Sequence, residues 1–105
     1  MGRGVALLAA LVLGGCGHLG AISEVTTYSC ADGSTVTAGY RGKRAVIHHR
    51  GKSHHLTIQP SASGARYTGE GVQWWTKGLT EGALSRLAPG EDVPSAGSLA
   101  CAAPT

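Results

Sequence analysis

The chain has 105 residues, a formal net charge of +3 at pH 7, and 17 glycines but no phenylalanine. This length is enough for a single small domain. The basic residues are scattered along the chain, which argues against the clustered basic surface of a nucleic-acid-binding protein.

The first fifteen residues have the features of an export signal. Arg3 precedes an apolar run from Val5 to Leu13, and this run is too short to span a bilayer as a mature helix. We therefore expect residues 1–15 to be a signal peptide that is removed.

A lipidation motif follows the apolar run. Leu13-Gly14-Gly15-Cys16 resembles the bacterial lipobox, in which small residues precede a cysteine that receives acyl chains. Several acyl chains anchor a protein almost permanently, since each buried methylene contributes about 0.8 kcal/mol. Gly17 stands where such lipoproteins commonly carry an aspartate if they stay in the inner membrane. We therefore expect residues 16–23 to be a lipidated tether in the outer membrane, with the protein facing the periplasm. A plain secretory signal with an incidental Cys16 is the weaker alternative.

The cysteine count agrees with lipidation. An exported protein with three cysteines has one left over, and if Cys16 carries lipid, Cys30 and Cys101 remain as a disulfide pair. The chain-entropy model assigns about 4 kcal/mol to closing a loop of about seventy residues. A free-thiol or metal role for the pair is a weaker alternative.

Residues 24–105 have the pattern of short β-strands. The segments EVTTYSC and TVTAGY flank a turn at Asp32-Gly33, and KRAVIHH and HHLTIQ flank a second turn near Gly51, so two hairpins are predicted. Three further strands, ARYTG, VQWWTK and GALSRL, are separated by glycines. The loop APGEDVPSAGS then leads to a last strand, LACA. Seven or eight such strands predict an all-β domain, either a small antiparallel barrel or a sandwich.

One segment leaves a second interpretation open. LTEGALSRL has the apolar spacing of one short helix. Gly82 inside it argues against a helix, because glycine destabilises helix interiors.

The segment VQWWTKG carries two adjacent tryptophans. Side chains alternate between the two faces of a strand, so one face takes Val72, Trp74 and Thr76, and the other takes Gln73, Trp75 and Lys77. One indole is therefore expected in the core and the other partly exposed beside Lys77. The preceding loop, Ser61 to Gly64, is expected to expose the Ser63 hydroxyl, with Gly64 permitting a tight bend.

At these residues the chain resembles the membrane-bound inhibitors of c-type lysozyme. The resemblance rests on Ser63-Gly64-Ala65-Arg66-Tyr67, in which the serine lies fourteen residues before the lysine of Trp74-Trp75-Thr76-Lys77-Gly78. The lipobox cysteine, the segment YSCADG and a closing cysteine support it. It implies an eight-stranded antiparallel barrel that binds c-type lysozyme, is not an enzyme and needs no cofactor.

The resemblance also implies a site. Ser63 and Lys77 are expected to enter the lysozyme cleft, Gly64 shapes their loop, and Tyr67 and Trp75 supply contact area around them. Lysozyme cleaves between a protonated carboxyl group and an ionised one. A lysine ammonium favours the ionised carboxylate, and a serine hydroxyl both donates to and accepts from the acid.

A rival site is the histidine-rich segment HHRGKSHH. A turn centred on Gly51 and Lys52 would pair the histidines across the hairpin on opposite faces, as His49 with His54 and His48 with His55. Each face would offer two imidazoles to copper or zinc, although no carboxylate or cysteine is near in sequence to complete the site. A metal-binding or cell-envelope interaction lipoprotein is therefore the alternative function. An enzyme has the least support, because no catalytic grouping stands out.

Overall fold

The computed structural model describes residues 24–104. The predicted signal peptide and the lipidated tether with Cys16 lie outside the described residues. No helix among the described residues is long and apolar enough to cross a membrane.

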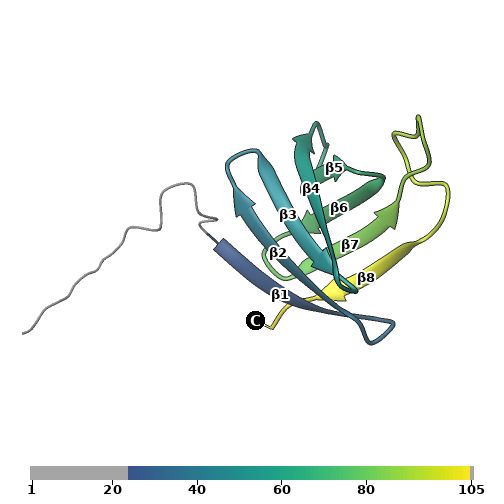
Figure 1. The fold of residues 1–105 in the computed structure, drawn as a ribbon. Helices are drawn as coiled ribbons and strands as arrows, with labels where there is room; N and C mark the ends of the chain where they lie inside the picture. Colours follow the sequence, from purple (N-terminus) through teal and green to yellow (C-terminus); the bar gives the residue numbers. More distant parts are fainter. Residues whose placement is uncertain (1–23, 105) are drawn as a thin grey trace, which may run out of the picture.

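Eight antiparallel strands form a closed barrel, each paired with the next along the chain (Figure 1). The strands are β1 (Glu24–Cys30), β2 (Thr35–Arg41), β3 (Arg44–His49), β4 (Lys52–Gln59), β5 (Ala65–Gly69), β6 (Val72–Lys77), β7 (Glu81–Arg86) and β8 (Ser98–Ala102). The predicted all-β class and barrel are confirmed, and the sandwich and the short helix around Gly82 are both wrong. The β7–β8 connection is the long loop expected from its composition.

The barrel closes where β8 meets β1. Only two residue pairs join these strands, Ser29 with Ala102 and Cys30 with Cys101. The second pair is also the predicted disulfide, with an S–S distance of 2.04 Å and a sequence separation of 71 residues. A covalent bond therefore reinforces the shortest ladder of the barrel.

Trp74 fills the barrel interior. Its side chain is fully buried, and its Nε1–H donates a hydrogen bond to the Tyr40 hydroxyl at 2.8 Å. The Tyr28 ring meets the indole edge-on at a centroid distance of 4.9 Å, and Tyr67 lies 5.6 Å from Tyr40. Burial raises the pKa of Tyr40 well above its ordinary value, so this phenol stays neutral at physiological pH.

The histidine hairpin has a different register from the one predicted. Its turn is centred on Arg50 and Gly51, both with positive φ (51° and 79°), and it pairs His49 with Lys52 and His48 with Ser53. A two-residue turn with two positive φ angles matches the twist of the strands. Arginine seldom adopts a positive φ, so the residue type at this position did not indicate the turn. The predicted histidine pairs across the hairpin are therefore wrong. Within residues 24–104, no three His, Cys, Asp or Glu side chains are grouped to hold a metal ion.

The turns after β1 and β3 are tied together at this end of the barrel. The Asp32 carboxylate accepts hydrogen bonds from the hydroxyl of Ser34 at 2.5 Å and from its backbone N–H at 2.9 Å, and it pairs with Arg50 at 2.6 Å. These hydrogen bonds and the guanidinium hold the pKa of Asp32 well below its ordinary value. Successive connections alternate between the two ends of an up-and-down barrel. The loop after β4 and the turn after β6 therefore lie at the opposite end.

Gly82 of β7 allows Trp74 to occupy the core. A Cβ at this position would overlap the six-membered ring of Trp74. The glycine therefore has a packing reason that strand periodicity does not reveal, because the residue that needs the space is on the neighbouring strand.

We expect Gly82→Ala to destabilise the domain by about 1–3 kcal/mol, the usual cost of inserting a group into a packed core. Urea unfolding followed by tryptophan fluorescence measures this change. Gly97→Ala is the matched control, because a Cβ there has nothing within 4 Å. Equal stability of the two variants would contradict the packing role.

Candidate functional site

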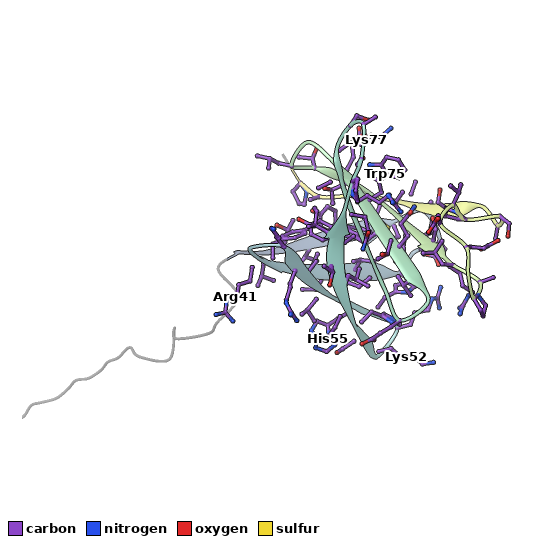
Figure 2. All side chains as sticks on the ribbon, turned by 90° about the horizontal axis from the view of Figure 1, so that it is seen from above. Arg41, Lys52, His55, Trp75 and Lys77 are labelled. Atoms are coloured by element: carbon purple, nitrogen blue, oxygen red, sulfur yellow. A yellow bond between two sulfur atoms is a disulfide. The ribbon has the colours of Figure 1, made fainter. Side chains whose placement is uncertain are left out.

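The loop after β4 and the turn after β6 meet at one end of the barrel. Ala65 pairs with Thr76, so the next position along the ladder places Gly64 beside Lys77. Figure 2 shows Trp75 and Lys77 together on one side of the molecule, with Lys52 and His55 on the opposite side. The two motifs that carry the family resemblance are therefore adjacent in space.

Strand β6 has the predicted alternation. Trp74 and Thr76 are 0% and 8% exposed and point inward, whereas Trp75 is half-buried on the outer face and Lys77 is exposed. Gln73 shares the outer face with Trp75 but is only 3% exposed. Alternation alone predicts the direction of this side chain and not its burial.

The backbone of the Ser63 loop is fixed to β6. The indole N–H of Trp75 donates to the Ser63 carbonyl at 2.9 Å, and the Ser61 hydroxyl donates to the same oxygen at 2.5 Å. Gly64 has φ +69°, and a Cβ there would overlap the Thr76 carbonyl and lie 2.9 Å from Trp75 Nε1. The glycine is therefore needed for its backbone angle and for the close approach of the loop to β6.

The side chains of Ser63 and Lys77 are left available. Both residues are exposed, and within the described part of the chain neither the Ser63 hydroxyl nor the Lys77 ammonium has a hydrogen bond or ion pair. Glu81 is the cross-strand neighbour of Lys77, yet the two form no ion pair. A rigid backbone thus presents one hydroxyl and one cation, the two groups that a pair of carboxyl groups can bind.

Arg66 is a positioning residue that the sequence reasoning missed. Its guanidinium donates to the Pro60 carbonyl at 3.4 Å, to Gln73 Oε1 at 3.2 Å and to the Asp92 carbonyl at 3.3 Å. It therefore ties the Ser63 loop to the loop between β7 and β8. Strand alternation could have indicated this role, because it places Arg66 opposite Tyr67, on the outer face of the strand that follows the Ser63 loop.

Tyr67 does not lie with the other candidates. It is 8% exposed, pairs with Trp74 across β5 and β6, and packs in the core. Burial also raises its pKa. The contact surface predicted for its ring does not fit this position, because the ring supports the site from inside the barrel. The alternation along Ala65–Gly69 was enough to place it there.

We expect Gly64→Ala to displace the Ser63 loop, because the added methyl group would overlap the β6 backbone. Gly78→Ala is the matched control, since Gly78 also has a positive φ (63°) but nothing within 4 Å of a Cβ. In ¹⁵N NMR spectra, the indole N–H resonance of Trp75 should shift in the Gly64 variant and stay in place in the Gly78 variant. Matching spectra of the two variants would show that the loop does not depend on this contact.

Comparisons with known proteins identify the family of this chain. Residues 28–92 match a family described as membrane-bound lysozyme-inhibitor of c-type lysozyme. A protein of Cupriavidus necator, named membrane-bound lysozyme inhibitor of C-type lysozyme, is 38% identical over 73 residues, which are 66% of this chain and 58% of that protein. The chain thus matches less than two thirds of that relative's length.

A solved structure supports the fold. The crystal structure of Pseudomonas aeruginosa MliC in complex with hen egg white lysozyme superposes with a TM-score of 0.54 and 24% sequence identity, covering 94% of this chain and 98% of that chain. The chain belongs to the family of membrane-bound inhibitors of c-type lysozyme, which are binding proteins and not enzymes.

Proposed function

We propose that this protein binds c-type lysozyme and blocks its active-site cleft with the Ser63 hydroxyl and the Lys77 ammonium. The observation that carries the proposal is that these two groups are exposed and without a partner among the described residues, at one end of the barrel. Membership of the inhibitor family supports the choice of target. The crystal structure of the Pseudomonas relative with hen egg white lysozyme also supports it.

The chemistry of the target explains why these two groups suit the task. Lysozyme holds one carboxyl group protonated as the acid and the other ionised. The Lys77 ammonium forms a charge-assisted hydrogen bond with the ionised carboxylate, and the Ser63 hydroxyl hydrogen-bonds to the acid. Neither group contains a glycosidic bond, so lysozyme cannot cleave the inhibitor. The occupied cleft also excludes the cell-wall substrate.

The fixed backbone makes this binding efficient. The Trp75 indole and Gly64 hold the Ser63 loop in place before the partner arrives, so less conformational entropy is lost on association. Trp75 is half-buried against the loop, and its remaining exposed surface adds apolar contact beside the polar pair.

We expect Lys77→Ala to weaken lysozyme binding by about 2 kcal/mol or more, which is about thirty-fold in Kd, because the lysozyme carboxylate loses its charged partner in a closed interface. Ser63→Ala should weaken binding up to about tenfold, the upper end for a hydrogen bond between neutral groups. Isothermal titration of residues 18–105 against a c-type lysozyme, with cell-wall lysis followed in parallel, measures both effects.

Lys52→Ala is the matched control, because Lys52 is an exposed lysine on the opposite side of the barrel (Figure 2). All three variants should keep the melting temperature of the wild type. The site assignment fails if Lys52→Ala weakens binding as much as Lys77→Ala. The function itself fails if the folded wild-type domain leaves lysis unchanged in micromolar excess.

We also propose that Cys16 anchors the protein by lipid to the outer membrane, facing the periplasm. The lipobox around Cys16 and the glycine after it support this location. Anchoring would hold the inhibitor beside the peptidoglycan that it protects. The membrane-bound name of the family is consistent with an anchor.

Cys16→Ser removes the thiol that accepts the acyl chains. We expect this variant to lose incorporation of labelled palmitate and to move from the outer-membrane fraction to the soluble fraction. Retention of the variant in the membrane fraction would contradict anchoring through Cys16.

A further inference from the structure

A groove of about 840 Å³ lies on the outer face of β6, β7 and β8 and reaches the end of β1 at Ser29 to Ala31. Trp75 and Lys77 form part of its wall, and the end of the β7–β8 loop, at Pro94 to Gly97, forms another part. We call it the outer groove. Its volume falls within the range of small-molecule sites, about 300–1,000 Å³.

Two buried polar side chains of the outer groove keep hydrogen-bonding groups that have no partner among the described residues. Gln73 is 3% exposed and Ser85 is 5% exposed, and they are cross-strand neighbours on β6 and β7. The Gln73 carbonyl oxygen accepts a hydrogen bond from Arg66 at 3.2 Å, but its amide N–H groups have no acceptor among the described residues. The Ser85 hydroxyl has no hydrogen bond to any described residue either. Buried polar groups are normally hydrogen-bonded. The Gln73 amide and the Ser85 hydroxyl are therefore suited to hydrogen-bond a ligand in the groove.

The rest of the lining describes the class of that ligand. The floor is flat, because Ala83 and Ala100 are paired across β7 and β8 and carry only methyl groups. The groove lies over the outer face of the sheet and not along the edge of a strand. A peptide therefore cannot bind there by adding a strand to the sheet.

The charges that line the outer groove favour a neutral ligand. The only ionised groups in the lining are Lys77 and Glu81, which have opposite signs and lie at one end. The Trp75 indole supplies an apolar surface. The Gln73 amide supplies hydrogen-bond donors, and the Ser85 hydroxyl can both donate and accept. Rings that carry many hydroxyl groups and have one apolar face match this combination.

We infer that the outer groove is a binding site for a short neutral saccharide, with Gln73 and Ser85 as hydrogen-bonding partners and Trp75 as the apolar wall. This site lies beside the proposed lysozyme-binding residues and shares Trp75 and Lys77 with them. It is a second binding activity of the domain and does not depend on lysozyme.

The test is an NMR titration of the ¹⁵N-labelled domain, residues 18–105, without lysozyme. The probes are N,N′-diacetylchitobiose and cellobiose at up to about 10 mM, which covers the weak affinities expected of a small site. We expect at least one probe to shift the side-chain amide of Gln73 and the indole N–H of Trp75. If neither probe shifts these resonances, the inference is overturned.

Two variants locate the binding. Ser85→Ala removes a hydroxyl that has no protein partner, so it should weaken the affinity about fivefold without lowering the melting temperature. Ala100→Leu fills the groove and should abolish saccharide binding, whereas Thr57→Leu, an exposed position on β4, should leave it unchanged. If Ala100→Leu and Thr57→Leu have the same effect, the saccharide binds elsewhere.

Lysozyme assays on the same samples separate this inference from the proposed function. Ser85→Ala should inhibit lysis like the wild type, because Ser85 is outside the Ser63 and Lys77 pair. A wild-type domain that inhibits lysozyme but binds neither probe contradicts only the saccharide site. A domain that binds a probe but does not inhibit lysozyme contradicts only the proposed function.

Discussion

The Trp74 indole, buried inside the barrel, determines how the core packs and which way the side chains of β6 point. Its Nε1–H donates a hydrogen bond to Tyr40, it packs edge-to-face with the Tyr28 ring, and its six-membered ring lies where a side chain at Gly82 would be. Replacing such a residue by alanine typically costs about 3–5 kcal/mol, a large share of the stability of a small domain. Because strand side chains alternate, an inward Trp74 requires Trp75 and Lys77 to point outward.

The outward Trp75 then organises the functional end. Its indole holds the Ser63 carbonyl, and Gly64 lets the loop lie directly on the β6 backbone. Arg66 joins this loop to the one between β7 and β8 through the carbonyls of Pro60 and Asp92. Backbone groups and supporting side chains are therefore paired, while the Ser63 hydroxyl and the Lys77 ammonium stay free. A site of this kind is preorganised, since the partner meets groups whose supports are already in place.

Much of the fold could be predicted from local sequence. Glycine-bounded strands, the alternation in β6 and the cysteine count led to the barrel, to the opposite directions of Trp74 and Trp75, and to the Cys30–Cys101 bond. The residues that escaped prediction depend on contacts between distant segments. Gly82 is explained only by Trp74 of the neighbouring strand.

In the site, too, the features that local sequence did not predict depend on contacts between distant segments. Gln73 is buried although it points outward, and Arg66 acts through three oxygens from different segments. The histidine register depended on a positive φ at Arg50, which a non-glycine residue seldom adopts. Tyr67 is a different case, because strand alternation alone placed its ring in the core and the family resemblance had suggested a surface role.

The proposed binding mode requires that lysozyme meets the end of the barrel that carries Ser63 and Lys77. The most direct measurement is an NMR titration of the ¹⁵N-labelled domain with an unlabelled c-type lysozyme. We expect the backbone signals of Ser63, Gly64, Lys77 and Gly78, together with the Trp75 indole N–H, to shift or broaden first and most. Changes centred on the Asp32 and Arg50 turns at the other end, with the Ser63 and Lys77 signals unmoved, would show that lysozyme binds elsewhere on the barrel.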